Sequence, residues 1–183
     1  DMLEAAALVG QGQTCDLLGD DLSLFSRLGA TTADFHLALA AAKKQATFKP
    51  QPLDDTYLTH LADGCADLAR LTLERLHGDL PRMPPDLEDL AHQVLALGDR
   101  LSSSFHDLAV MKSRAQRIRC HGDYHLGQVL RRGEDWVLLD FEGEPLRSLS
   151  ERQQHHSPLK DVAGMLRSFA YAAMHVQLRL EAE

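Results

Sequence analysis

The hydrophobic pattern of this chain changes character at Ile118, and this change limits the folds that the chain can adopt. Before Ile118, apolar residues recur at intervals of three and four, which is typical of amphipathic helices. After it, short apolar runs bounded by turn residues replace the helical period and favour small strands. The pattern therefore predicts an α+β protein that is predominantly α-helical.

Three long helices are predicted before the change. The first covers residues 22–44, and the second begins after Asp54 or Asp55, either of which can cap it, and ends near Gly78. The third runs from Asp86 to about Arg117, with room for an interruption at the serines of 102–104. Prolines separate these helices, because proline cannot continue a helix.

Three short strands and a final helix are predicted after the change. The strands are Ile118–Cys120, Gln128–Arg131 and Trp136–Phe141. Gly133–Asp135 supplies turn residues between the second and third strands, so these two are expected to form a hairpin. The final helix is expected over residues 161–180.

Composition narrows the classes of protein. With 183 residues, 44% of them hydrophobic, one domain spanning 1–183 is the default expectation. The net charge of −8 offers no basic footprint for nucleic acid. Three cysteines in no metal-ligand spacing favour reduced thiols and a cytoplasmic location. No apolar run reaches membrane-spanning length, so a membrane partner is not expected.

The segment HGDYHLGQ (121–128) concentrates groups that can transfer protons or bind metals between two strand-like runs. Asp140 stands at the end of the next run, WVLL, which would hold its carboxylate beside that segment. Phosphoryl transfer needs a carboxylate that orients the attacking hydroxyl and oxygen ligands that hold Mg²⁺. Asp123 suits the first role, while Asp140 and the amide of Gln128 suit the second.

The strings HGDYHLGQ, WVLLDFEGEP and SPLKDVAGMLRSFAYAA resemble the maltokinase family, part of the aminoglycoside-phosphotransferase-like group in the protein-kinase-like superfamily. The resemblance is strongest over Arg117–Ala173. It implies the C-terminal lobe of a kinase-like fold with a small β-hairpin. It also implies transfer of the ATP γ-phosphoryl group to the anomeric hydroxyl of maltose, with ATP and Mg²⁺ as cofactors and maltose 1-phosphate as product.

The resemblance also implies roles for individual residues. Asp123 corresponds to the catalytic base, and His121 braces the catalytic loop. Gln128 and Asp140 correspond to the Mg²⁺ ligands, and Asp161 to the helical carboxylate that anchors the loop. Candidates for sugar binding are His125, Glu142, Glu144 and Tyr171.

One part of a kinase has no counterpart in the sequence. A Gly-rich phosphate loop followed by a strand lysine does not occur before the predicted helices. We therefore expect the ATP-binding half to be an N-terminal lobe of a parent protein, either a stand-alone kinase or a fusion with trehalose synthase. The isolated chain is expected to be inactive.

Other interpretations remain open from the residues alone. The chain could be a non-catalytic kinase-like binding module, or a kinase for an aminoglycoside or another small molecule. A metallohydrolase is a further alternative, because His121, Asp123 and His125 alternate and would share one face of a strand. Two further hypotheses concern single sites: His36 is a core or boundary histidine outside the catalytic set, and His155–His156 is an exposed loop pair.

Overall fold

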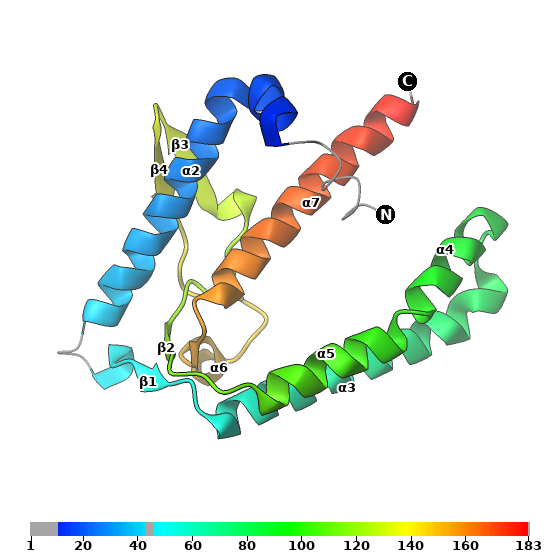
Figure 1. The fold of residues 1–183 in the computed structure, drawn as a ribbon, viewed down its shortest axis with the longest axis horizontal. Coiled ribbons are helices and arrows are strands. Elements are labelled where there is room, and N and C mark those ends of the chain that lie inside the picture. Colours follow the sequence, from blue (N-terminus) through cyan, green and yellow to red (C-terminus); the bar gives the residue numbers. More distant parts are fainter. Residues whose placement is uncertain (1–10, 43–45, 183) are drawn as a thin grey trace. The chain divides into compact units, whose positions relative to one another are not determined.

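The computed structural model describes residues 11–42 and 46–182 (Figure 1). The chain divides into two compact units: the first comprises the residues up to Gln51 and those from Arg117 onward, and the second comprises Pro52–Gln116. The expectation that 1–183 is a single kinase-like domain stays a prediction. The residues that carry the candidate chemistry lie in the first unit.

Two long helices form the frame of the first unit. They are α2 (Gln11–Ala41) and α7 (Leu159–Ala182), and α2 begins well before the predicted start at residue 22. The buried positions of α2 follow one another at intervals of four, which places them on one face of the helix. These positions are Leu24, Leu28, Thr32 and His36.

The strands form two small sheets. β1 (Gln51–Pro52), β2 (Gln116–Arg119) and β5 (His155–His156) form one sheet in the order β1-β2-β5. β3 (Val129–Arg132) and β4 (Asp135–Leu138) form the other, paired antiparallel with Val129 opposite Leu138. The predicted hairpin is therefore confirmed, with Gly133 in the left-handed region at φ 65°.

The core of the first unit lies between the two long helices and the hairpin. Buried side chains from α2, α7, β3 and the loop before the hairpin form one cluster: Leu28, Tyr124, Val129 and Met165. Trp136 packs against this cluster, and its indole N–H donates a hydrogen bond to the carbonyl of Leu24 at 2.9 Å. This bond fixes the hairpin against α2.

Three helices make up most of the second unit. α3 (Asp55–Asp79) is capped by Asp54, whose carboxylate accepts a hydrogen bond from the backbone N–H of Tyr57 at 2.9 Å. The single predicted third helix is two helices, α4 (Pro85–Leu95) and α5 (Gly98–Val110). The chain therefore breaks at Ala96–Leu97, before Gly98, and the serines at 102–104 lie inside α5.

Short elements account for the other differences from the sequence-based predictions. One-turn helices occur at η1 (Ala46–Phe48), η2 (Leu80–Arg82), η3 (Leu126–Gln128) and α6 (Leu149–Arg152). The prediction of an exposed loop pair at His155–His156 is wrong, because both residues form β5. His155 is 8% exposed and lies opposite Arg119.

The α+β class predicted from the sequence is confirmed, with about 66% of the residues in helices. None of the helices within 11–42 and 46–182 combines the length and the apolar character that crossing a membrane requires. The fold places the loop of residues 121–128 between α7 and the hairpin.

Candidate functional site

The carboxylate of Asp161 holds the start of the loop His121–Gln128, which is called the catalytic loop from here on after the role that the sequence predicts for it. Its Oδ2 accepts a hydrogen bond from the backbone N–H of His121 at 2.8 Å, and its Oδ1 accepts one from the N–H of Gly122 at 3.0 Å. His36 Nε2 donates to Oδ2 as well, at 2.8 Å. The side chain is 2% exposed, so these bonds replace the water that it has lost.

These contacts also set the ionisation of Asp161. Burial alone raises the pKa of a carboxyl group, because it disfavours the charged form. The hydrogen bonds from His36, Gly122 and His121 outweigh that effect and hold the pKa of Asp161 below its usual value. The carboxylate is therefore a permanent acceptor at neutral pH.

One face of α7 contacts the catalytic loop over two helical turns. Ser168 Oγ accepts a hydrogen bond from the backbone N–H of Leu126 at 3.0 Å, seven residues after Asp161. Between them lies Gly164, where a Cβ atom would come within 2.6 Å of the backbone oxygen of Tyr124. The loop can approach the helix this closely because position 164 has no side chain.

Tyr124 fixes the middle of the catalytic loop against α2. Thr32 Oγ1 donates to the carbonyl of Leu28 at 2.8 Å, so the hydroxyl of Tyr124 donates to Thr32 across the remaining 2.6 Å contact. Burial raises the pKa of Tyr124, which keeps the phenol protonated. Tyr124, which follows Asp123 in the chain, is therefore held by α2, whereas the neighbouring loop residues are held by α7.

His121 connects the catalytic loop to the end of the hairpin. Its Nε2 donates to the carbonyl of Leu139 at 2.7 Å, and its side chain is 1% exposed. Asp140 follows directly, at φ 52° in the left-handed region, where Asp is among the residues that the backbone tolerates. A residue held in this conformation is a common feature of functional sites.

Gln128 lies next to this strand end. The backbone N–H of Leu139 donates to the carbonyl of Gln128 at 2.9 Å, which extends the hairpin register by one step toward Asp140. A carboxylate and an amide on neighbouring strand ends would provide oxygen ligands that suit Mg²⁺, which takes few protein ligands and completes its shell with phosphate and water.

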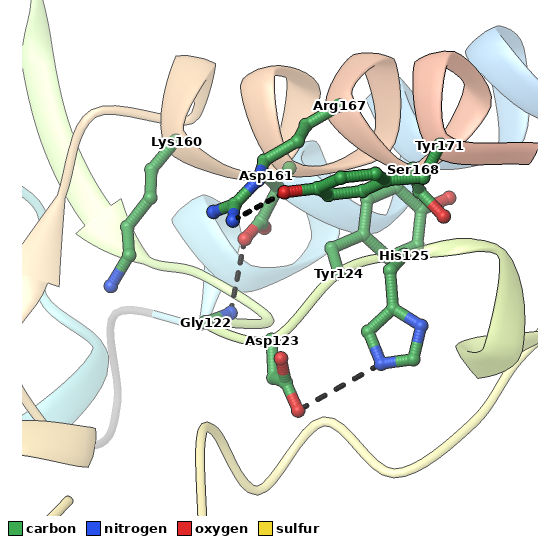
Figure 2. Close-up of a pocket in the computed structure, with 10 residues that line it drawn as sticks. Gly122, Asp123, Tyr124, His125, Lys160, Asp161, Arg167, Ser168 and Tyr171 are labelled. Carbon is green, nitrogen blue, oxygen red and sulfur yellow. Dashed lines mark hydrogen bonds and ion pairs between the residues drawn. The ribbon is translucent and has the colours of Figure 1, made fainter. Parts of the chain in front are cut away.

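A pocket of about 400 Å³ opens above Asp123, between the catalytic loop and α7 (Figure 2). Asp123 and His125 line it from the loop, with the side chain of Asp123 35% exposed. Lys160, Arg167 and Tyr171 line it from α7. The Tyr171 hydroxyl accepts a hydrogen bond from Arg167 Nη2 at 3.0 Å, and the guanidinium lies 5.2 Å from the centre of the tyrosine ring.

The segment Asp140–Arg147, called the acidic segment below, is far more exposed. Glu142 is exposed, and Glu144 forms an ion pair with Arg147 at 2.6 Å. Gly143, at φ 85°, packs closely against Gly122: a Cβ atom on Gly122 would lie 3.3 Å from its Cα. The acidic segment therefore passes beside the catalytic loop, but neither glutamate lines the pocket above Asp123.

The arrangement required by the metallohydrolase interpretation is not formed. Among residues 11–42 and 46–182, no three His, Cys, Asp or Glu side chains are placed to hold a metal ion together. His121 Nε2 is bonded to Leu139, and His125 Nδ1 accepts a hydrogen bond from the backbone N–H of Gly127 at 3.0 Å. The two histidines thus have separate structural partners.

Sequence reasoning missed the residues that hold the loop from behind. His36 is buried and hydrogen-bonded, as predicted for a core or boundary histidine, but its bond to Asp161 was not predicted, and neither were the contacts of Thr32 and Ser168 with the loop. The sequence does contain a signal for two of them. Thr32 and His36 continue the four-residue spacing of the apolar face of α2, and polar side chains on such a face need buried partners.

Comparison with known proteins supports a kinase-like fold. No family model matches the chain. A glucosamine kinase from Mycolicibacterium smegmatis is 44% identical over 54 residues, which are 30% of this chain and 14% of that protein. A glucosamine kinase from Streptacidiphilus jiangxiensis is 34% identical over 62 residues, or 34% of this chain and 14% of that protein.

Solved structures extend the likeness to most of the chain. A glucosamine kinase in complex with glucosamine, ADP and inorganic phosphate matches with a TM-score of 0.61 and 25% identity, over 84% of this chain and 34% of that structure. A second crystal form matches with a TM-score of 0.65 at 24% identity, which shows the fold alone. The chain has the fold of a sugar-kinase lobe.

The matching proteins are much longer than this chain. The chain spans about a seventh of the length of the two curated relatives and about a third of the solved kinases. All of these proteins are named as glucosamine kinases, so the narrower resemblance to maltokinases stays a prediction.

Proposed function

We propose that this chain is the catalytic-loop lobe of an ATP-dependent sugar kinase, with Asp123 as the base that accepts the proton of the attacking hydroxyl. The observation that carries the proposal is the anchoring of the loop: Asp161 binds the backbone of His121 and Gly122, and the next residue, Asp123, faces the pocket. A fixed carboxylate beside a sugar-sized cavity suits in-line phosphoryl transfer, where positioning is the main protein contribution.

The residues of this chain would act in a definite order. The sugar occupies the pocket between Asp123 and Tyr171, with a hydroxyl directed at the Asp123 carboxylate. As that oxygen attacks the γ-phosphorus of ATP, its proton passes to Asp123 and the bond to the bridging oxygen of ADP breaks. The donors of Lys160 and Arg167 face the same pocket and can bind sugar oxygens.

The proposed reaction uses ATP as the phosphoryl donor and Mg²⁺ as a cofactor. Gln128 and Asp140 would hold Mg²⁺, which shields the charge of the nucleotide phosphates when it is bound. The residues that grip ATP would come from an N-terminal lobe of the parent protein, because the sequence has no Gly-rich loop with a strand lysine. His121 would hold Asp140 in place through Leu139.

The acceptor sugar has two candidates. Maltose, giving maltose 1-phosphate, is supported by the resemblance of the motifs at 121–128 and 136–145 to maltokinases. Glucosamine is supported by the names of the relatives and of the matching structures. We give maltose priority because the three strings that resemble maltokinases cover the catalytic loop, the strand end with the proposed Mg²⁺ ligand Asp140, and part of α7. Tyr171 is the proposed sugar contact, and Glu142 and Glu144 are weaker candidates outside the pocket.

The proposal is tested with the full-length parent protein, ATP and Mg²⁺, by measuring phosphorylation of maltose, glucosamine and glucose. Asp123→Asn should lower kcat by roughly a thousandfold or more, since a positioned base and its electrostatic effect are lost together. Asp140→Asn should have a similar effect, because asparagine also tolerates the left-handed backbone but supplies no charge for the metal.

Two controls make this test specific. Asp99→Asn changes an exposed carboxylate in the second unit and should leave kcat unchanged. Thermal unfolding of the Asp123 and Asp140 variants should match that of the wild type, so that lost activity reflects chemistry. Wild-type rates in Asp123→Asn, or a parent protein that phosphorylates no sugar, would refute the proposed function.

A further inference from the structure

We infer that His125 is a positioning residue that acts through Asp123, and this role rests on the proposed function of Asp123 as base. The inference differs from the sugar contact that the sequence suggested for His125. It assigns the imidazole the task of holding one oxygen of the Asp123 carboxylate while the other oxygen accepts the proton from the sugar.

The backbone fixes the orientation of the His125 ring. The N–H of Gly127 donates to Nδ1 at 3.0 Å, and the same side chain caps the short helix η3. Because the Nδ1 lone pair accepts this bond, the proton of the neutral ring lies on Nε2. The ring thus presents a donor on the side opposite to its backbone contact.

That donor points at the base. Nε2 lies 3.9 Å from Asp123 Oδ2, and Figure 2 shows the two side chains facing each other across the floor of the pocket. The distance is too long for a hydrogen bond, but such contacts commonly shorten when substrate closes a site. In the closed geometry, Nε2–H donates to Oδ2, and Oδ1 is left to accept the hydroxyl proton.

Two polar groups from α7 in the pocket have other partners. Ser168 Oγ accepts from Leu126, and the Arg167 guanidinium bonds to Tyr171. Within the part of the chain that the structure describes, His125 is the basic side chain found within ion-pair distance of Asp123. Orientation of this carboxylate therefore falls to one imidazole.

Gly127 shows that the ring position is built into the loop. A Cβ atom at position 127 would lie 2.8 Å from His125 Cε1 and 3.0 Å from Nδ1, so any side chain there displaces the ring. Gly127 is not among the glycines with positive φ. Alanine at this position therefore fits the backbone and moves the imidazole, which makes Gly127→Ala a selective probe of ring position.

The experiment uses the full-length protein with ATP, Mg²⁺ and the sugar that it phosphorylates. His125→Leu should lower kcat roughly 10- to 100-fold, the range found when a group that orients a functional residue is removed, while the sugar KM changes less than about twofold. His125→Gln, whose amide N–H can reach the same oxygen, should retain most of the rate. His175→Leu, on an exposed position of α7 outside the pocket, is the matched control and should behave as wild type.

A double-mutant cycle separates positioning from packing. Gly127→Ala should lower kcat in the wild-type background and have no further effect in His125→Leu, because the ring that it displaces is already gone. A raised sugar KM with unchanged kcat in His125→Leu would overturn the inference in favour of a sugar contact. Equal losses in His125→Gln and His125→Leu, or additive effects in the cycle, would also overturn it. An inactive Asp123→Asn beside a fully active His125→Leu would refute this inference and leave the proposed function standing.

Discussion

The catalytic loop and the acidic segment are neighbours that the fold holds in different ways. The catalytic loop is tied by buried hydrogen bonds to α7 at Asp161 and Ser168 and to α2 at Thr32. The acidic segment is largely exposed: Glu144 pairs with the nearby Arg147, and the exposed ring of Phe141 lies with its centre 5.8 Å from that of Phe35 on α2. The proposed base, Asp123, thus follows residues held by buried groups, whereas the side chains after Asp140 are largely accessible to a ligand.

This difference predicts that substitutions behind the catalytic loop affect folding, whereas those in the acidic segment affect it little. Free energies of unfolding of single variants, measured by chemical denaturation of the same protein, test this difference.

The largest effect is expected for Asp161→Ala. The substitution leaves the buried N–H groups of His121 and Gly122 and the His36 ring without their acceptor, which should cost about 3–5 kcal/mol. Asp55→Ala removes an exposed carboxylate from the first turn of α3 and should cost under about 1 kcal/mol. Equal losses of unfolding free energy in the two variants would show that the buried hydrogen bonds of Asp161 stabilise the protein no more than an exposed carboxylate does.

The next effect is expected for Gly164→Ala. The new methyl group would lie 2.6 Å from the backbone oxygen of Tyr124, so α7 and the loop must separate, at a cost of about 1–3 kcal/mol. Gly29→Ala, at a helical position with open space around it, is the control and should stabilise by up to about 1 kcal/mol. An unchanged free energy of unfolding in Gly164→Ala would mean that the loop does not depend on close contact with α7.

A third prediction concerns pH and β5, which pairs with the strand that leads into the catalytic loop. Burial lowers the pKa of His156 from 6.5 to about 4. The unfolded chain then binds the proton first, so stability should fall as the pH drops from 6.5 to 4. The full shift would correspond to roughly 3 kcal/mol, and the partial exposure of the ring reduces the expected loss to about 1–2 kcal/mol.

The Asp161 contribution has a separate pH window. Its pKa is depressed below 3.8, so the stability that it provides is present above that value and is lost as the pH falls further. His156→Gln should flatten the curve between pH 6.5 and 4 and leave the more acidic limb unchanged. A curve for His156→Gln that overlays the wild type in the upper window would contradict the burial of this ring.

The smallest effect is expected for Arg147→Gln in the acidic segment. The ion pair with Glu144 is solvent-exposed, and the substitution should change the free energy of unfolding by less than about 0.5 kcal/mol. A loss of unfolding free energy comparable to that of Gly164→Ala would show that the acidic segment is supported as firmly as the catalytic loop.

Much of the architecture follows from local sequence rules. The change of hydrophobic period at Ile118, the cap at Asp54 and the turn at Gly133 depend on residues close together in the chain, so the helices and the hairpin were predictable. β5 was not, because a two-residue strand exists only through its pairing with β2. The break in the third predicted helix fell at Ala96–Leu97, where no proline marks it.

The same division applies to the site. The sequence by itself placed Asp123, Gln128 and Asp140 in one small region, because a loop and a hairpin bring residues less than twenty positions apart together. Only the tertiary structure paired His36 with Asp161 and Thr32 with Tyr124, across 125 and 92 positions of chain. Such partners are decided by which helix faces pack together, since a buried polar group bonds to whatever donor or acceptor the packing brings within reach.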